Sequence, residues 1–293
     1  MKLKISELFY SIQGEGRYMG VPSVFLRTFG CNFQCAGFGM PRGEKTTEVD
    51  DIIKLDKQAK FKTYGQLPLV KTGCDSYASW HPKFRDLSPT YENDELSDMI
   101  VDTLPFKEWR EEHLVITGGE PLLGWQREYP DLLNQPRMQK LKEITIETNG
   151  TQPLHEDFRY FLSDWTSRRS SSALTFSVSA KLSCSGEKKE DAICPDVVAE
   201  YSHFGYTYLK FVIANEQDAE EALEAVKEYR LAGFDGHVYL MPIGGDEHTY
   251  RLNNKAVANL AMRNGLRYSD RLQVPLFKMS GGHRVAYKPR PII

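Results

Sequence analysis

The chain has 293 residues, of which 41% are hydrophobic and 26% charged, enough to build one sizeable core, and we expect a single domain over residues 1–293. Its formal net charge is −3 with both signs mixed along the sequence, which argues against direct nucleic-acid binding and against a polybasic membrane anchor.

Cysteine content and hydropathy bear on the cellular compartment in which the protein is expected. No apolar stretch approaches the roughly 18 residues of a membrane span, and the N-terminal residues lack the apolar region of a signal peptide. Five cysteines are too few, and odd in number, for a disulfide scaffold. We therefore expect a cytoplasmic protein with reduced thiols and no membrane contact.

The first local feature is a turn at residues 13–16, with the sequence Gln-Gly-Glu-Gly. Two glycines beside an acid permit a tight turn that aims Glu15 away from the backbone, although an ordinary polar surface turn has the same composition. Arg27 follows in a predicted strand, residues 23–29, whose other side chains are mostly apolar. A charge in such a strand is usually paired or faces a ligand.

Three cysteines form the most informative pattern. Cys31 and Cys35 are four positions apart, and Cys74 follows after 38 further residues. Three thiolates can hold three irons of a four-iron cluster and leave the fourth iron free to bind a substrate-like molecule. A Cys-x3-Cys pair alone more often reflects packing than metal binding, so this hypothesis depends on the motifs that accompany it.

The segment between the second and third of these cysteines, residues 36–73, has its own character. It begins with loop chemistry at residues 37–43, and residues 48–60 are typical of a short amphipathic helix. Such a segment is either a solvated excursion, since loop lengthening costs little entropy, or a lid or partner surface beside the cysteines.

The remainder of the chain alternates strands with helices. A helix is predicted over residues 216–229, whose apolar positions recur at three and four and whose interior lacks Gly and Pro. Six units of parallel strand and crossover predict an α/β layer, but are too few for an eightfold barrel. The strand-like runs centre near Val24, Val115, Ile146, Phe176, Phe211 and Leu240.

Polar motifs end several of these strands, at residues 118–121, 147–150 and 177–181. Ligands of α/β folds gather at the carboxyl ends of strands, which explains why such motifs would occur there. The two glycines of the first motif let the backbone approach a ligand, and Glu120 can accept hydrogen bonds from an ammonium group. Each motif by itself is also compatible with a simple strand-ending turn.

The order of these motifs resembles that of radical S-adenosylmethionine enzymes and, among them, the 7-carboxy-7-deazaguanine synthase (QueE) family. That family's cluster motif is Cys-x3-Cys-x2-Cys-Asp-Thr with a Trp six residues after the third Cys. Here Cys74, Asp75 and Ser76 are followed by Trp80, so the two-residue gap has become the 36–73 insertion. The resemblance continues to residues 271–278 and implies a partial (β/α)6-type TIM-like barrel of the radical S-adenosylmethionine kind, with an inserted segment between the second and third cluster cysteines.

The resemblance also implies roles for individual residues. The 4Fe-4S cluster would be held by Cys31, Cys35 and Cys74. The pterin substrate would contact Gln13, Glu15, Gly16 and Arg27, with Arg27 on its carboxylate. S-adenosylmethionine would contact Gly118, Gly119, Glu120, Thr148, Asn149, Ser179 and Lys181. Ser76 replaces the family's Thr as a ligand of Mg²⁺.

The implied activity is that of a carbon-nitrogen lyase. The enzyme would convert 6-carboxy-5,6,7,8-tetrahydropterin to 7-carboxy-7-deazaguanine by radical ring contraction with loss of ammonia, as in queuosine-type biosynthesis. The family further implies a flavodoxin or ferredoxin-type reductant and a homodimer.

Some positions depart from the family pattern. Gly73 replaces an aromatic residue beside the adenine, for which Phe38 could substitute, while Met241 replaces a Gln and Phe277 a His. Cys184 and Cys194 are interpreted as free thiols.

Two other functions stay open at this point. A glycyl-radical activating enzyme shares the cluster but not the residue 13–16 motif or Arg27. A non-catalytic zinc or iron-sulfur binding module would use the same cysteines, although structural zinc normally closes its tetrahedron with four ligands.

Overall fold

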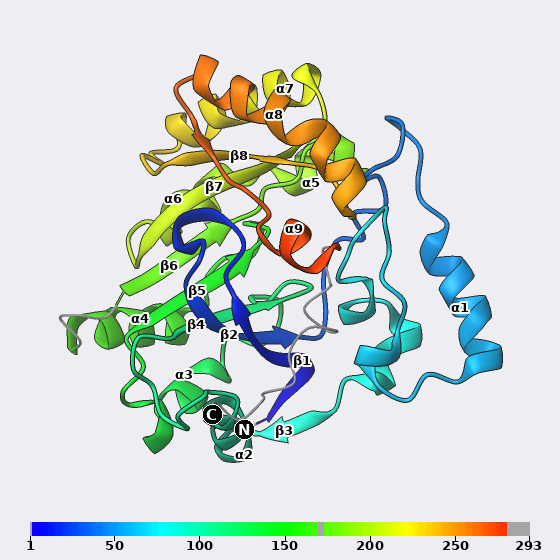
Figure 1. Ribbon diagram of the computed structural model, residues 1–293. Coiled ribbons are helices and arrows are strands. Elements are labelled where there is room, and N and C mark those ends of the chain that lie inside the picture. Colours follow the sequence, from blue (N-terminus) through cyan, green and yellow to red (C-terminus); the bar gives the residue numbers. More distant parts are fainter. Residues whose placement is uncertain (1, 169–172, 280–293) are drawn as a thin grey trace.

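The computed structural model describes residues 2–168 and 173–279, which form one nine-stranded sheet (Figure 1). The strand order is β3-β1-β2-β4-β5-β6-β7-β8-β9, so the sheet is open, with β3 and β9 at its edges. Strands β2 and β4 to β9 run parallel, whereas β1 is antiparallel to both β2 and β3. The strands are β1 (Lys2–Ile12), β2 (Pro22–Thr28), β3 (Thr90–Glu92), β4 (His113–Gly118), β5 (Glu143–Thr148), β6 (Ala173–Val178), β7 (Tyr206–Ile213), β8 (Val238–Pro242) and β9 (Arg267–Tyr268).

The predicted α/β class and all six predicted parallel strands are confirmed, since each predicted centre lies in one of β2 and β4 to β8. The antiparallel β1 and the two short edge strands β3 and β9 were not predicted. Strand β1 carries polar side chains among its apolar ones and is only partly buried, so its sequence lacks the continuous apolar run of the central strands.

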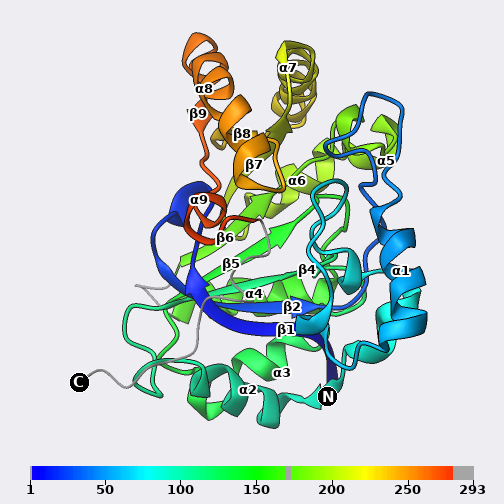
Figure 2. The same cartoon turned by 45° about the vertical axis from the view of Figure 1, so that its right-hand side comes forward.

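Helices connect the parallel strands in the usual crossover manner. Helices α2 and α3 pack together and lie at the bottom of both Figure 1 and Figure 2. The predicted helix over residues 216–229 is α7, which extends two residues further and begins where the Asn215 side chain accepts a hydrogen bond from the Asp218 N–H. The helices are α1 (Glu48–Ala59), α2 (Asn93–Asp102), α3 (Tyr129–Leu133), α4 (Glu156–Arg168), α5 (Lys189–Ala192), α6 (Pro195–Tyr201), α7 (Glu216–Leu231), α8 (Glu247–Arg263) and α9 (Gln273–Phe277).

Side chains of the central strands alternate between two environments, because successive residues of a strand point to opposite faces. One face carries apolar residues that join the main core beneath the helices, among them Leu26, Ile116, Ile146, Phe176 and Leu240. The neighbouring positions on the other face line a cavity, and most of these are polar: Arg27, Thr117, Glu147, Ser177 and Met241. The sheet therefore separates a helix-covered hydrophobic core from a polar interior.

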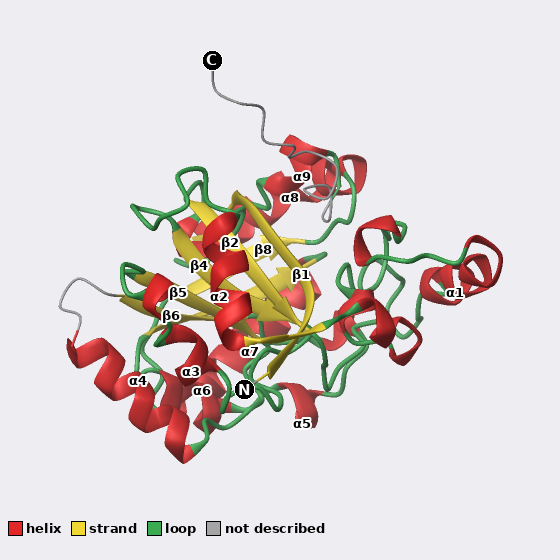
Figure 3. Cartoon of the chain, turned by 90° about the horizontal axis from the view of Figure 1, so that it is seen from below, coloured by secondary structure: helices red, strands yellow, loops and turns green. Residues whose placement is uncertain are grey.

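The 36–73 insertion contains the predicted helix, α1, which stands away from the sheet (Figure 3). A separate small core holds this region together, made of residues on both sides of the third cysteine: Ile52, Tyr64, Leu67, Val70, Tyr77, Ala78 and Phe84. Two hydrogen bonds reinforce it, from the Tyr77 hydroxyl to the Pro68 carbonyl at 2.8 Å and between the Tyr64 and Ser79 hydroxyls at 3.1 Å. The insertion is thus a folded unit with its own packing.

Within the described ranges, no helix combines the length and the apolar character needed to traverse a bilayer.

Candidate active site

A cavity of about 510 Å³ opens at the carboxyl ends of the parallel strands, a size typical of small-molecule sites. Thirteen of the fifteen residues predicted from the sequence line it, although they come from seven separate segments of the chain. They are Gln13, Glu15, Arg27, Cys31, Cys35, Cys74, Ser76, Gly118, Gly119, Thr148, Asn149, Ser179 and Lys181.

Gly16 does not line the cavity, and its contact with the substrate stays a prediction. Its φ is +67°, and a Cβ built there would lie 2.2 Å from the Tyr208 hydroxyl. Its N–H donates to the Ser269 hydroxyl at 2.8 Å. The glycine therefore permits close packing of the turn against β7, which is a structural role.

Glu120 is fully buried behind the wall and does not line the cavity either. Its carboxylate accepts hydrogen bonds from the N–H groups of Leu122 (3.0 Å) and Asn149 (2.6 Å) and from the Thr148 hydroxyl (2.8 Å). Burial raises the pKa of this carboxyl. These bonds tie Glu120 to the ends of β4 and β5, and its contact with the cofactor stays a prediction.

The three cysteines of the predicted cluster motif lie in one cluster of packed side chains with Phe33, Phe38 and Ala192. Burial raises the pKa of the Cys31 thiol to about 12 and that of Cys74 to about 11, and it also raises the pKa of Cys35 well above its usual value. Each pKa is also raised by at least one neighbouring cysteine or carboxylate, because a second negative charge nearby disfavours the thiolate. A bound cation would offset this cost of ionising them.

In the described part of the chain, no three His, Cys, Asp or Glu side chains converge closely enough to hold a single metal ion. A four-iron cluster asks for a different geometry, because each thiolate binds its own iron at a separate corner. Three free cysteines on one cavity wall suit that requirement, whereas a structural zinc would need four converging ligands.

The two ends of the insertion form a neck that returns the chain to the first two cysteines. The Gly73 N–H donates to the Phe38 carbonyl at 2.7 Å, and the Thr46 N–H donates to the Ala36 carbonyl at 2.9 Å. The Thr46 and Thr72 hydroxyls are 2.6 Å apart. This neck explains how a two-residue gap can lengthen to 38 residues without separating the third cysteine from the other two.

Glycines and small polar groups form the wall next to Cys31. A Cβ at Gly119 would lie 2.4 Å from the Gly30 carbonyl oxygen and 2.7 Å from the Cys31 Cβ, so only glycine fits there. Lys181 also lines the cavity, and its ammonium donates to the Ser179 carbonyl (2.6 Å) and hydroxyl (2.9 Å). This wall offers a cradle for a ligand backbone together with a cation suited to a carboxylate.

Arg27 lies between the cysteine loop and the sheet. Its guanidinium donates to Glu7 at 3.1 Å, to the Ser76 hydroxyl at 2.7 Å and to the Gly118 carbonyl at 3.1 Å. Tyr64 and, after it, the carboxylates of Glu7, Asp75 and Glu147 outweigh burial and raise its pKa above the usual range. The strand charge noted in the sequence is therefore both paired and exposed to the cavity.

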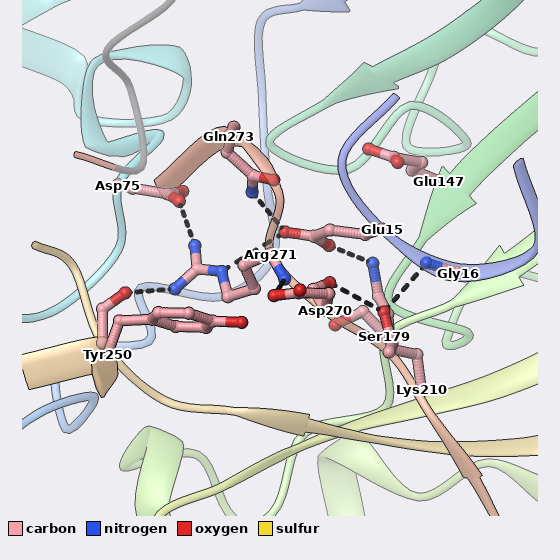
Figure 4. A network of polar contacts seen from close by, with 12 residues as sticks. Glu15, Gly16, Asp75, Glu147, Ser179, Lys210, Tyr250, Asp270, Arg271 and Gln273 are labelled. Carbon is pink, nitrogen blue, oxygen red and sulfur yellow. Dashed lines mark hydrogen bonds and ion pairs between the residues drawn. The ribbon is translucent and has the colours of Figure 1, made fainter. Parts of the chain in front are cut away.

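Glu15 lies at the centre of a polar network (Figure 4). It accepts hydrogen bonds from Lys210 at 2.5 Å, Arg271 at 3.3 Å and Gln273 at 2.7 Å. Burial alone would raise its pKa, but Lys210 and Arg271 together lower it to about 2. Arg271 also donates to Asp75 at 3.1 Å, so the network reaches the residue after the third cysteine.

Sequence reasoning missed several cavity residues, namely Asp75, Glu147, Lys210, Arg271 and Gln273. For two of them the signal was available, since Glu147 and Lys210 are charged residues inside otherwise apolar strands, as Arg27 is. Arg271 and Gln273 belong to the closing segment and gave no such signal, because only the fold brings α9 next to the 13–16 turn.

The two remaining cysteines and the residues that depart from the family pattern differ in whether they line the cavity. Cys184 and Cys194 are free and do not line the cavity. Phe38 and Met241 do line it, whereas Phe277 does not.

Comparison with known proteins finds relatives that carry the same name. No family model matches the chain. A 7-carboxy-7-deazaguanine synthase of Halobacterium salinarum is 32% identical over 287 residues, covering 94% of this chain and 90% of that protein. One of Pyrobaculum aerophilum is 25% identical, covering 93% and 94%. The crystal structure of QueE from Escherichia coli has the same fold, with a TM-score of 0.52, 19% identity and coverage of 93% and 95%.

Proposed function

Because the chain belongs to the 7-carboxy-7-deazaguanine synthase family, we propose that its cavity converts 6-carboxy-5,6,7,8-tetrahydropterin to 7-carboxy-7-deazaguanine with loss of ammonia. The observation that carries this proposal is that the three cysteines, Glu15 and Arg27 line one cavity. The proposed cluster ligands and the groups proposed to bind a carboxypterin would thereby be within reach of one small molecule.

Family membership implies a 4Fe-4S cluster and S-adenosylmethionine, and the residues present fit both. Cys31, Cys35 and Cys74 would hold the cluster, while the Gly118 and Gly119 backbone, Ser179 and Lys181 would hold the cofactor. When bound, the pair supplies one-electron reductive cleavage of the sulfonium and the 5′-deoxyadenosyl radical that removes a hydrogen atom from substrate. Three thiolates would suffice for three irons of such a cluster, and the Lys181 ammonium could bind the carboxylate of the cofactor.

The chain's contribution is to orient the substrate and to exclude water. Gln13 and Glu15 offer an amide and a carboxylate, which match the amino-pyrimidinone edge of a pterin. Because the pKa of Glu15 is held at about 2, this carboxylate is ionised and accepts hydrogen bonds throughout the neutral range. Arg27 supplies a permanent cation for the substrate carboxylate.

We further propose that Mg²⁺ binds next to Ser76. Its hydroxyl faces the cavity beside Asp75 and Arg27, and hydroxyl and carboxylate oxygens are ligands that Mg²⁺ accepts. A flavodoxin or ferredoxin-type protein as reductant and a homodimeric assembly complete the proposal, both on the ground of family membership.

The direct test is anaerobic incubation of the reconstituted protein with the carboxypterin, S-adenosylmethionine, a chemical reductant and Mg²⁺, followed by mass spectrometry. We expect 7-carboxy-7-deazaguanine to form in excess of 5′-deoxyadenosine, because loss of ammonia alone balances the conversion and the abstracted hydrogen atom has to be returned. Formation of 5′-deoxyadenosine without the deazaguanine would point to another radical enzyme, such as a glycyl-radical activating enzyme. Absence of both from a cluster-loaded protein would remove the proposal.

A further inference from the structure

Two carboxylates outside the cysteine motif hold the backbone of the cysteine loops. Glu187 accepts hydrogen bonds from the N–H groups of Gln34 (2.9 Å) and Cys35 (2.7 Å) through one oxygen. Cys35 has a φ of +51°, a left-handed conformation that is unfavourable for a residue with a side chain. The Glu187 bonds therefore stabilise a strained turn that aims the second thiol into the cavity.

Glu48 does the same for the segment before the third cysteine. Its carboxylate accepts hydrogen bonds from the Lys71 N–H (2.9 Å), the Thr72 N–H (3.0 Å) and the Thr72 hydroxyl (2.6 Å). Glu48 is the first residue of α1, so the helix of the insertion holds residues 71–72, the segment that leads back to Cys74. Each oxygen accepts at least one bond, which fixes the backbone two and three residues before Cys74.

The conformation at the neighbouring residue leaves little freedom. Gly73 has a φ of +75°, and a Cβ there would lie 2.6 Å from the Thr46 side chain. The Thr46 hydroxyl in turn accepts a bond from the Glu48 N–H at 3.2 Å. Glu48, Thr46 and Thr72 thus close a small polar ring around the glycine that precedes the third thiol.

We propose that Glu48 is a positioning residue for the third cluster ligand, and that the 36–73 insertion thereby holds Cys74 in place for the cluster. Glu187 has the matching role for Cys35. The proposal rests on the proposed function, since it presumes a cluster on these thiolates. It assigns the insertion a role that differs from both a solvated excursion and a mobile lid.

The mechanism is that of residues surrounding a metal site. Such residues fix the orientation of the ligands, so their loss weakens metal retention even though they touch no metal. Replacing Glu48 with Gln keeps its size but turns one acceptor oxygen into a donor, which faces N–H groups that need an acceptor. The 71–73 segment should then fluctuate, and the third thiolate should release its iron more readily.

The experiment uses the full-length protein, anaerobically reconstituted, as wild type, Glu48→Gln and Glu187→Gln. Asp50→Asn is the matched control, because Asp50 is an exposed carboxylate in the same first turn of α1. The measurements are iron and sulfide content, the EPR spectrum of the reduced cluster and the rate of iron loss to a chelator. We expect iron loss to be about tenfold faster in Glu48→Gln and Glu187→Gln, with Asp50→Asn equal to wild type.

Hydrogen exchange in the cluster-free protein separates positioning from general support of the insertion. Positioning predicts faster exchange at Lys71 and Thr72 in Glu48→Gln, with α1 protected as in wild type. If α1 loses protection as well, the carboxylate merely holds the insertion folded and the proposal is wrong. Thr72→Val, which removes the hydroxyl bonds to Glu48 and Thr46 but keeps both N–H bonds to Glu48, should give an intermediate rate of iron loss and serves if Glu48→Gln does not fold.

The outcomes are distinguishable from failure of the proposed function. Wild-type rates of iron loss in Glu48→Gln, in a protein whose wild type carries a cluster, would overturn the positioning role and leave the proposed activity intact. A wild-type protein that assembles no cluster would overturn both.

Discussion

Arg271 donates a hydrogen bond to Asp75 at 3.1 Å, across 196 positions of the sequence. The same guanidinium donates to Glu15 and to the Gly244 carbonyl. One side chain from the closing segment therefore joins the substrate turn to the residue after the third cysteine. The proposed substrate-binding turn and the proposed cluster loop are physically connected through this contact.

Replacing Arg271 with Met should uncouple cofactor cleavage from product formation, because Glu15 and the Asp75 loop would no longer be held in register. We expect the KM for the carboxypterin to rise about tenfold, the effect of losing a charged hydrogen bond, and more 5′-deoxyadenosine to form per product. The KM is measured from initial rates at varied carboxypterin concentration, and the ratio is measured by quantifying the two products in the same reactions. Arg110→Met, which breaks an exposed pair with Glu108, is the control, and an unchanged product ratio in Arg271→Met would refute the connection.

The Glu15–Lys210 pair should behave as a buried ion pair, since the two side chains are 16% and 5% exposed. Glu15→Gln leaves the Lys210 ammonium buried with less compensation, and we expect a loss of about 3 kcal/mol in the free energy of unfolding. The double variant Glu15→Gln with Lys210→Met should recover part of that loss. Urea unfolding of the wild type, the two single variants Glu15→Gln and Lys210→Met, and the double variant completes the double-mutant cycle. Additive losses in the free energy of unfolding would show that the two side chains do not interact.

The pH dependence of the same pair follows from the lowered pKa of Glu15. Its pKa is about 2 in the folded protein against 4.5 ordinarily, so the stability it contributes is complete above about pH 4.5 and is lost as the pH falls toward 2. The wild type should thus lose more stability than Glu15→Gln over that interval.

Gly119→Ala should disturb the Cys31 loop without unfolding the sheet, because the new methyl group would contact the Gly30 carbonyl and the Cys31 side chain. The reconstituted variant should hold less iron and bind S-adenosylmethionine more weakly, as measured by iron analysis and equilibrium dialysis. Gly65→Ala is the matched control, since no atom lies within 4 Å of its added Cβ. Equal iron content in the two variants would contradict the close approach at Gly119.

His113 gives a prediction about folding stability that does not depend on the proposed reaction. It is fully buried, and desolvation lowers its pKa to about 4 from 6.5. Below pH 6.5 the unfolded chain binds a proton that the folded chain does not, so folding stability falls as the pH drops from 6.5 toward 4. Between pH 7 and pH 5 this costs about 2 kcal/mol.

His113→Gln should remove that part of the acid sensitivity, whereas the exposed His203→Gln should keep it. Urea unfolding at the two pH values measures both. An identical drop in all three proteins would assign the acid sensitivity to other groups.

The α/β layer could be predicted from the sequence because the central strands are continuous apolar runs and α7 has clean helical periodicity. The cavity residues on strand ends could be predicted for the same reason, since parallel strands end at one edge. Strand β1 could not, because polar residues interrupt its apolar ones and most of its side chains are only partly buried, which gives it no simple pattern.

The contacts of Glu120 and Gly16 could be seen only in the folded structure. A sequence shows that a glutamate follows two glycines, but not that three hydrogen-bond donors from β5 and its own loop already surround it. Likewise, Tyr208 lies 192 positions from Gly16 in the sequence, and only tertiary packing reveals the close approach. Contacts between distant segments also explain why Arg271 was missed.

The central claim is that Cys31, Cys35 and Cys74 act as one ligand set, and iron analysis with EPR of Cys74→Ala tests it most directly. We predict about four irons per chain and a reduced-cluster signal in the wild type and in Cys184→Ala, with both greatly diminished in Cys74→Ala. A Cys74→Ala protein that retains the wild-type iron content and EPR signal would contradict the account.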